Sequence, residues 1–356
     1  MRILARPAFA NHATDPGNAA LYGEIQRLGC TIIEGTNSSL LKRKADIVHL
    51  HWPDNVLRSP IVGAATFRVF TLFCVLSLQR LRGAKIVWTA HNAASHEHHH
   101  PQLERIFWRG LMRRLDAIIA HSETVKQQLQ ARSNSRIPII VVPLSCFHGL
   151  YPEPQIGRTK DPKLCRLGFV GRIRRYKGVD ELVDAFASSS QENIRLLIRG
   201  KPEDRQTAAT VEELCSRDPR IDLKLGFLSP NQLSTDVAGL DAVILPFKWV
   251  TNSGSALLSL SLGTKVIVPD TEYFRELQSE FGSSWVYCFK APFTSDTLAD
   301  IAPWAQAAKE STKPIFSQKR SIAWAARTTL DFYQTVISTY PCFQLPVQCF
   351  HLRPHS

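Results

Sequence analysis

A run of positively charged residues lies within FVGRIRRYKG, residues 169–178. An apolar segment precedes this run, and an amphipathic segment follows it. The apolar segment predicts a buried strand over 166–170, and apolar residues at helical spacing predict a helix over 179–187. Open α/β sheets bind ligands beyond the carboxyl ends of their strands, and guanidinium and ammonium groups placed there suit a diphosphate. The cations are Arg172, Arg174, Arg175 and Lys177. From residue types alone, a diphosphate site and a solvated basic loop both remain open.

Histidines cluster in a second loop, within IVWTAHNAASHEHHH at residues 86–100. A strand is predicted over Lys85–Ala90. The polar side chains beyond its carboxyl end are His91, Asn92, His96 and Glu97. A metal site is not predicted, because the histidines at 98–100 are consecutive, lack an i,i+4 helical frame, and have no Cys or Asp cluster beside them. An active-site loop and a solvated polar loop are the two remaining interpretations.

The segment DIVHLHWPD, residues 46–54, is a third predicted strand that ends in polar side chains. His49 falls inside the apolar strand, where we expect a hydrogen-bonded core histidine. His51, Trp52 and Asp54 come at the strand end. There the aromatic face of Trp52 offers a stacking surface for the C–H side of a sugar.

Two predicted helices begin with small polar residues. Free backbone N–H groups at a helix start can bind an anion, and small side chains let it approach. The first helix begins at Gly17-Asn18, where Asn18 serves either as a plain N-cap or as a ligand contact. The second begins with Thr251, Asn252, Ser253, Gly254 and Ser255.

Predicted strands and helices alternate along the chain. The strands are Ile3–Phe9, Cys30–Glu34, Asp46–Trp52, Lys85–Ala90, Ala117–Ala120, Ile139–Pro143, Arg166–Val170, Ile194–Arg199, Asp222–Gly226, Ala242–Pro246, Lys265–Val268 and Trp285–Phe289. The helices cover 18–28, 60–82, 101–114, 122–131, 179–187, 205–217, 230–239, 254–262, 271–280, 294–309 and 317–338. This alternation indicates an α/β protein with two doubly wound parallel, Rossmann-like sheets.

The stretch FVGRIRRYKGVDELVDAF resembles the opening of the nucleotide-binding domain in GT-B glycosyltransferases, especially family 4 and its relatives. In that family, the arginine after the glycine and the lysine before the next glycine clamp the donor's diphosphate. They match Arg172 and Lys177, next to Gly171. Weaker similarity covers most of residues 1–340. The resemblance implies a metal-independent hexosyltransferase (EC 2.4.1 type) without a cofactor, and no DxD-type metal motif is found.

The helix start at 251–255 departs from the family 4 pattern. That pattern carries two glutamates eight residues apart, and the aligned positions here are Val250 and Leu258. The Ser-Gly-Ser form resembles instead a group of bacterial exopolysaccharide transferases that includes inverting, xanthan-type β-mannosyltransferases. The resemblance implies that residues 251–255 hold the donor through hydroxyls and backbone.

The loop pattern WTxHNxxxHE resembles the loop of the N-terminal domain that faces donor and acceptor in many bacterial GT-B transferases. It implies that His91 orients the sugar or polarises a hydroxyl. Inverting chemistry needs a base, for which the candidates are His96, Glu97 and Asp54, whereas retaining chemistry does without it. We expect Asn18, His51, Trp52 and Asn92 to face the acceptor.

The resemblance also implies a division of the chain, with the break in the Pro-, Gly- and charge-rich segment 147–163. A length of 356 residues suits two domains of about 150 residues. We expect an acceptor-binding domain at 1–150, a donor-binding domain at 164–316, a helix at 317–340 that returns to the first domain, and a loose tail at 341–356. Transfer from GDP-mannose or a UDP-sugar to a saccharide or lipid-linked saccharide is the expected activity.

The formal net charge of +12 implies an anionic partner. Nucleic-acid binding or scaffolding is an alternative function, but the cations lie at strand ends and helix faces instead of alternating with aromatics on one face, so no nucleic acid is expected. A GT-B phosphorylase or epimerase is another alternative, although no motif marks a lysine for pyridoxal phosphate. The eight cysteines lack ligand-like spacing, and no signal peptide is evident, which indicates a reducing cytoplasm.

Segment 60–82 carries the apolar run VFTLFCVLSL, which is bracketed by arginines. Ten apolar residues are too few to span a bilayer that needs about 20. A buried helix and an interfacial helix that leans on lipid are both open. Basic stretches at 42–44 and 109–114 favour an anionic surface as partner, at the inner face of the plasma membrane.

Overall fold

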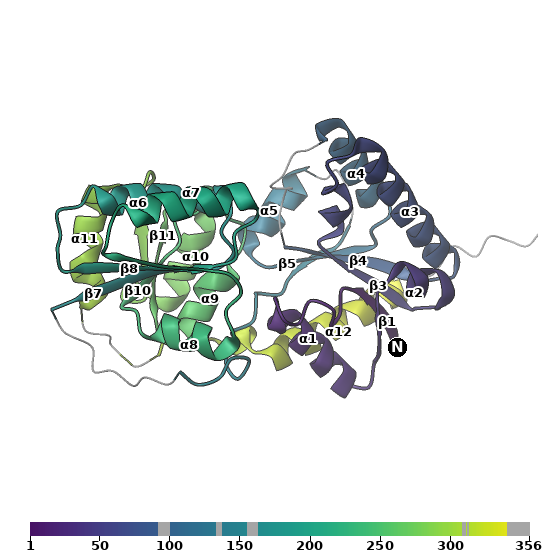
Figure 1. Ribbon diagram of the computed structural model, residues 1–356. Coiled ribbons are helices and arrows are strands. Elements are labelled where there is room, and N and C mark those ends of the chain that lie inside the picture. The colour runs from purple at the N-terminus through teal and green to yellow at the C-terminus, as the bar shows by residue number, and fades with distance from the viewer. Residues whose placement is uncertain (92–99, 133–136, 155–162, 308–310, 312, 340–356) are drawn as a thin grey trace, which may run out of the picture.

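The described residues of the chain form two parallel β-sheets of six strands each, flanked by helices (Figure 1). This computed structural model describes residues 1–91, 100–132, 137–154, 163–307, 311 and 313–339. The first sheet has the strand order β2-β1-β3-β4-β5-β6. Its strands are β1 Arg2–Arg6, β2 Thr31–Glu34, β3 Ile47–His51, β4 Lys85–Ala90, β5 Ala117–Ala120 and β6 Ile139–Val141.

Helices cover both faces of the first sheet. On one face lie α1 (Pro16–Arg27) and the last helix, α12 (Ile322–Thr339). The other face is covered by α2 (Asn37–Lys42), α3 (Val62–Leu81), α4 (Pro101–Met112) and α5 (Glu123–Arg132). The central strands β3 and β4 are buried along their whole length, as expected for a parallel sheet covered on both faces.

The second sheet has the order β12-β11-β10-β7-β8-β9. Its strands are β7 Cys165–Val170, β8 Ile194–Gly200, β9 Ile221–Leu225, β10 Ala242–Ile244, β11 Lys265–Pro269 and β12 Val286–Phe289. Its helices are α6 Val179–Ala187, α7 Arg205–Ser216, α8 Pro230–Ala238, α9 Gly254–Ser261, α10 Glu272–Phe281 and α11 Ser295–Gln306. Helices α6 and α7 lie on one face, and α8 and α9 on the other (Figure 1).

Each sheet has a point where the direction of winding reverses. In the first sheet this point lies between β1 and β3, and in the second between β7 and β10. Connections leave such neighbouring strands to opposite sides, which opens a crevice beyond their carboxyl ends where ligands bind. The topology therefore assigns the chemistry to the loops that follow these four strands.

After the second sheet the chain returns to the first, where α12 packs against α1. The junction before α12 is held by Arg320, which is buried and pairs with Glu280 of α10 at 2.6 Å. The same guanidinium donates to the carbonyl of Leu144, just after β6, at 2.9 Å. One arginine thus connects the second domain to the end of the first sheet.

The predicted fold class is confirmed: two doubly wound parallel sheets with a C-terminal helix that crosses back. Each of the twelve predicted strands is present with small shifts at its ends. Helix α2 was not predicted, because six residues show too little periodicity, although a capping box from Thr36 and Ser39 starts it. The domain limits at 150, 164 and 317 stay predictions, and the tail at 341–356 lies outside the described residues.

Close packing at the carboxyl end of β8 gives a stability prediction. A Cβ on Gly200 would lie 1.7 Å from the carbonyl oxygen of Gly171, so Gly200→Ala must push β7 and β8 apart. We expect a loss of several kcal/mol in the free energy of unfolding. Gly23→Ala in α1 is the control, because nothing lies within 4 Å of its Cβ, and there helix propensity should add about 1 kcal/mol. Equal melting temperatures for the two variants would contradict this close approach.

Candidate active site at the carboxyl ends of both sheets

Three polar elements converge on Gly171, the residue that follows β7. Its φ of +146° is a conformation that favours glycine. A Cβ placed there would lie 3.0 Å from Ser255 Oγ and 3.4 Å from Lys177 Nζ. The end of β7, the basic loop and the first turn of α9 therefore meet at one point, at the reversal between β7 and β10.

Lys177 is the central cation of this point. Burial, together with the charges of Arg174 and Arg172, lowers the pKa of its ammonium to about 7. Its Nζ also lies 4.9 Å from the centre of the Phe247 ring. Like charges that gather in a partly desolvated place are stabilised when an anion binds among them. The geometry is therefore suited to a phosphate or diphosphate.

The other cations of the loop have different roles. Arg174 pairs with Glu203 at 3.5 Å and hydrogen-bonds Tyr176, so it stabilises the loop itself. Arg172 is largely exposed, and partial desolvation of its guanidinium together with the charges of Arg174 and Arg58 lowers its pKa. Arg58 follows a short helix, η1 (Pro53–Leu57), of the first domain. The positive charge of Arg58 in the first domain therefore repels that of Arg172 in the second domain.

The start of α9 presents a small set of backbone donors. Ser253 is the N-cap, and its hydroxyl accepts from the amide of Ala256 at 3.1 Å. Its own amide donates to Tyr273 Oη at 3.1 Å. The amides of Gly254 and Ser255 remain as first-turn donors that make no hydrogen bond within the helix.

The side chains of Thr251 and Asn252 differ from expectation. Both had been assigned to the donor, but Thr251 Oγ1 donates at 3.0 Å to the main-chain carbonyl of His91 in the first domain. Asn252 Nδ2 donates to the same carbonyl oxygen. A single acceptor in the first domain thus holds the segment that leads into α9.

The first domain contains a buried hydrogen-bonded set of side chains that we name the histidine array. Its members are Tyr22, His49, His51, Thr89, His91, His121 and Tyr333. Tyr22 Oη lies 2.6 Å from both His49 Nδ1 and His51 Nε2. From His51 Nδ1 the array continues to His91 Nε2 at 2.8 Å, and from His91 Nδ1 to His121 Nε2 at 3.3 Å.

The array ends at a backbone carbonyl on one side and at a threonine hydroxyl on the other. His121 Nδ1 lies 2.9 Å from the carbonyl oxygen of Val142, and His49 Nε2 lies 2.7 Å from Thr89 Oγ1. Burial lowers the pKa of His49 to about 3 and that of His121 to about 4. Burial also places the pKa values of His51 and His91 well below the ordinary value. All four imidazoles are therefore neutral near pH 7.

This arrangement corrects two expectations. His51 was expected to face the acceptor and His91 to act on the sugar, but both ring nitrogens of each are bonded within the array. His49 is a hydrogen-bonded core histidine, as its place in the strand indicated. Trp52, with a positive φ of 47°, stacks one face on the His91 ring at 4.0 Å, so only its other face remains for a ligand.

The remaining candidates are distributed as follows. Asn18 is buried and its amide donates to the carbonyls of Pro7 and Ala8, while Asp15 caps α1 in its place. Asp54 is buried in η1. Asn92, His96 and Glu97 lie outside the described residues.

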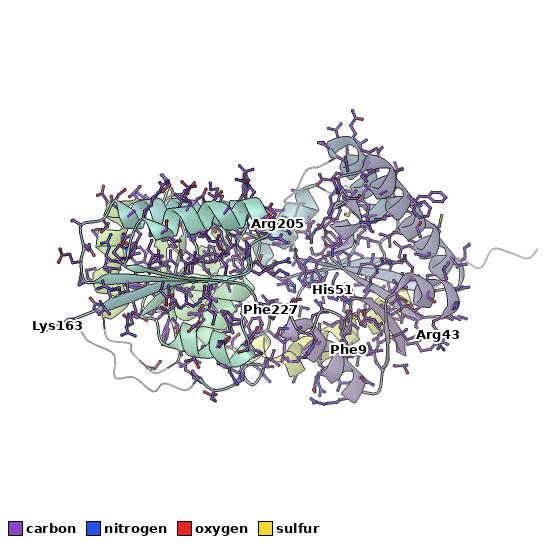
Figure 2. The ribbon with its side chains drawn as sticks, viewed as in Figure 1. Phe9, Arg43, His51, Lys163, Arg205 and Phe227 are labelled. Carbon is purple, nitrogen blue, oxygen red and sulfur yellow. The ribbon has the colours of Figure 1, made fainter. Side chains whose placement is uncertain are left out.

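Sequence reasoning missed several residues of this region. Tyr22, His121 and Tyr333 join the array from three separate elements, and no local spacing connects them. Phe227, which follows β9, is 63% exposed at the carboxyl end of the second sheet. In Figure 2, Phe227 and His51 lie where the two halves face each other. The sequence signal for Phe227 was its place directly after the predicted strand Asp222–Gly226.

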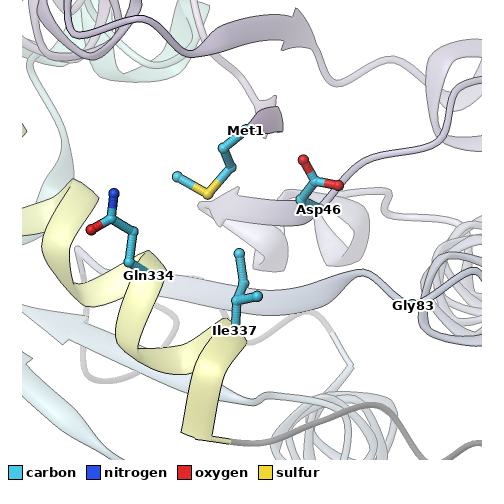
Figure 3. A pocket seen from close by; sticks show the side chains of 5 residues that line it. All are labelled: Met1, Asp46, Gly83, Gln334 and Ile337. Carbon is cyan, nitrogen blue, oxygen red and sulfur yellow. The ribbon is translucent and has the colours of Figure 1, made fainter.

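A pocket elsewhere in the first domain is not part of this site. It is lined by Met1, Asp46, Gly83, Gln334 and Ile337 (Figure 3). Met1, Asp46 and Gly83 precede β1, β3 and β4, so this pocket lies at the amino ends of the strands. The candidate active site lies at their carboxyl ends, on the opposite edge of the sheet. Within the described ranges, no three His, Cys, Asp or Glu side chains are placed to hold a metal ion.

Comparison with known sequences points to sugar transfer. Residues 165–298, which contain Gly171, Lys177 and Ser255, match the family model described as glycosyl transferases group 1. A GDP-mannose:glycolipid 4-β-D-mannosyltransferase of Xanthomonas campestris pv. campestris is 29% identical over 324 residues, which cover 89% of this chain and 87% of that protein. Glycogen synthase 2 of Nitrosococcus oceani is 26% identical over 203 residues, 52% of this chain and 40% of that protein.

Solved structures share the fold. Sucrose-phosphate synthase of Thermosynechococcus elongatus superposes with a TM-score of 0.68 over 95% of this chain and 99% of that one, at 14% identity. Anabaena HepE, solved in complex with UDP-glucose, gives a TM-score of 0.63 over 95% and 99%, at 16% identity. At such identities the likeness is one of fold.

The paired sheets, the site at their facing carboxyl ends and the sequence matches define a glycosyltransferase of the GT-B fold. Within this class, the chain is similar over most of its length to two GDP-mannose:glycolipid 4-β-D-mannosyltransferases of Xanthomonas campestris.

The neutral histidines predict a loss of stability in mild acid. Each has a folded-state pKa below the unfolded value of about 6.5, so the unfolded chain binds more protons as pH falls below 6.5. Each should lower the free energy of unfolding by up to about 1.4 kcal/mol per pH unit until its folded pKa is reached. Urea unfolding at pH 7.5, 6 and 5 measures this effect, and His49→Gln should reduce the slope by one proton. A flat profile between pH 7 and 5 would contradict buried neutral histidines.

Proposed function

We propose that the protein transfers a sugar from a nucleotide-diphosphate donor to a saccharide or lipid-linked saccharide acceptor. The observation that carries this proposal is the convergence of Lys177 Nζ and Ser255 Oγ on Gly171. A cation, a hydroxyl and two helix-start amides at one reversal point form a binding site for a diphosphate.

The chemistry of this site follows from where charge develops. As the glycosidic bond to the donor breaks, positive charge grows on the sugar and negative charge on the leaving diphosphate. Fixed cations stabilise that negative charge, and Arg172 and Lys177 of the second domain are assigned to it. Arg58 of the first domain adds a third cation whose charge acts on Arg172. These groups can stabilise the leaving group without a metal ion.

Donor identity is proposed from relatives and from the aromatic residue at the sheet edge. The Xanthomonas relative is named for GDP-mannose, and HepE was solved with UDP-glucose. Phe227, exposed after β9, offers a stacking face for the nucleobase. We infer GDP-mannose or a UDP-sugar as the donor.

The acceptor side is assigned to the loops of the first domain. The free face of Trp52 offers stacking for the acceptor sugar. For inverting chemistry, the base would come from Glu97, His96 or Asp54, because both ring nitrogens of His91 already have partners. In this proposal, His91 holds the second domain and does not take the proton.

A membrane role is proposed from the outer side of the first domain, on the far side from the second (Figure 1). Helix α3 is long and apolar enough to cross a bilayer by length and composition alone, yet it packs against α2, α4 and β4. Its outward stripe includes Phe67 and Phe70, which are 69% and 65% exposed. Exposed cations also lie on α3 and on the segments that pack along it, namely Lys42, Arg43, Lys44, Arg68, Arg105 and Arg109.

Exposed apolar side chains on an outer face that also carries cations suit the surface of an anionic membrane, and each cation contributes about 1 kcal/mol. A lipid-linked acceptor of bacterial exopolysaccharide synthesis fits this location. The protein would then work in the cytoplasm as a peripheral enzyme at the inner face of the plasma membrane.

A donor screen tests the proposed function. The protein is incubated with UDP-, GDP- and dTDP-sugars and a lipid-linked saccharide, and nucleotide release is measured. Release of nucleoside diphosphate that depends on acceptor supports the proposal. Binding of nucleic acid without any nucleotide release would favour the scaffold alternative.

Substitution of the diphosphate cations gives the first functional prediction. Arg172→Ala and Lys177→Ala should each lower kcat by about 100-fold or more while the protein stays folded, because each removes a fixed donor to the leaving group. Arg175→Ala is the matched control, since it removes an exposed cation from the same loop. Wild-type turnover in Arg172→Ala or Lys177→Ala would refute the assignment of that residue.

The metal-free mechanism predicts that transfer survives chelation. Turnover with an excess of EDTA should equal turnover in untreated enzyme, because cations of the protein stabilise the leaving group. A complete loss of activity in EDTA that manganese or magnesium restores would overturn this mechanism.

Membrane attachment is tested by sedimentation with vesicles. Wild type should sediment with vesicles of anionic lipid, and added salt should release it, because screening weakens surface electrostatics. The double variant Phe67→Ser/Phe70→Ser should remain in solution. Ile315→Ser is the control, because Ile315 is 88% exposed outside the first domain's outer face. If wild type stays in solution at low salt, the membrane role is wrong.

A further inference from the structure

The hydrogen bonds of the histidine array have a single direction. The carbonyl oxygen of Val142 can only accept, so the proton of neutral His121 is on Nδ1. Its Nε2 therefore accepts from His91 Nδ1–H, and His91 Nε2 in turn accepts from His51 Nδ1–H. His51 Nε2 then needs a donor, and the O–H of Tyr22 lies 2.6 Å away.

The same reasoning assigns the hydrogen bonds of His49, which lies at the inner end of the array beside Thr89 and Tyr333. Because Tyr22 donates its proton to His51, its oxygen accepts from His49 Nδ1–H at 2.6 Å. His49 Nε2 then accepts from the hydroxyl of Thr89. Tyr333 of α12 lies 2.5 Å from His49 Nδ1 and hydrogen-bonds Tyr22, so it closes the inner end. Every ring nitrogen of the array has a partner, and the Nδ1–H of His49 faces the hydroxyl oxygens of both tyrosines.

An array with no free nitrogen cannot take up a proton without breaking a bond. It is therefore a rigid support, and at His91 it contacts the second domain. The ring of His91 is held at both nitrogens and stacked on Trp52, and its amide donates to the carbonyl of Thr89 at 3.0 Å. Its carbonyl then receives Thr251 and Asn252 from the second domain.

We propose that Tyr22 and Tyr333 are positioning residues for sugar transfer, because they fix His91 through the array and His91 holds the start of α9 against the first domain. The inference rests on the proposed donor site at that helix start. Both tyrosines are buried in the first domain and act on the second through a chain of bonded side chains. The hydroxyl groups carry the effect, because that of Tyr22 supplies the proton that His51 requires and that of Tyr333 holds His49 beside Tyr22.

Hydrogen–deuterium exchange tests the proposal without any substrate. In Tyr22→Phe and Tyr333→Phe, the segment 250–262 of the second domain should exchange about tenfold faster than in wild type, which corresponds to about 1.4 kcal/mol. Gln79→Met is the control for loss of a buried polar group, because Gln79 is fully buried in the same domain and donates to the carbonyls of Leu40 and Arg43. The control should destabilise the first domain and leave exchange of 250–262 unchanged.

A double-mutant cycle tests the link to catalysis. Tyr22→Phe and Asn252→Ala should each lower kcat about tenfold, and the double variant should also lose about tenfold, because both act through one contact. Tyr333→Phe with Asn252→Ala repeats the cycle in case Tyr22→Phe folds poorly. Unchanged exchange at 250–262, or kcat losses that multiply to about 100-fold, would overturn the proposal.

The two measurements separate this inference from the proposed function. If no nucleotide sugar is turned over, the proposed function fails, and the exchange experiment alone decides whether the tyrosines position the start of α9. If transfer is observed but exchange is unchanged, the tyrosines have only a structural role in the first domain.

Discussion

One carbonyl oxygen, that of His91, joins the two domains where the loops of both sheets meet. It accepts from Thr251 and Asn252, which lead into the first turn of α9. The same turn presents Ser255 to Gly171 and Lys177. The position of the proposed diphosphate site relative to the first domain therefore depends on how firmly this peptide group is held. Hydrogen bonds made inside a protein and out of water are strong enough for that role.

The fold could be predicted from the sequence because parallel sheets covered on both faces give apolar strands that alternate with amphipathic helices. Strands β3, β4 and β7 are such segments, and the basic loop after β7 was assigned correctly to the carboxyl end of a strand. Helix α2 was missed because its six residues are too short for periodicity, and its signal is only a local cap.

The site was harder to predict than the fold, because sequence patterns report where a residue lies and not which partner it finds. His51 ends β3 and His91 follows β4, as expected, but their ring nitrogens turn inward to Tyr22 and His121. Tyr333 contacts His49 across 284 positions of sequence, and no spacing rule reaches so far. Thr251 and Asn252 sit at a helix start, as ligand-binding residues often do, yet their acceptor belongs to the other domain.

The contribution of α12 to the first domain has a consequence for biosynthesis. The first sheet is complete once β6 has been made, but His49 and Tyr22 meet their last partner only when Tyr333 has left the ribosome. Between these two events the whole second domain is translated, and it can fold as a unit of its own. The domain that is synthesised first is therefore the last to close its core, and throughout that interval the face of its sheet that α12 will cover remains open to solvent or to a chaperone.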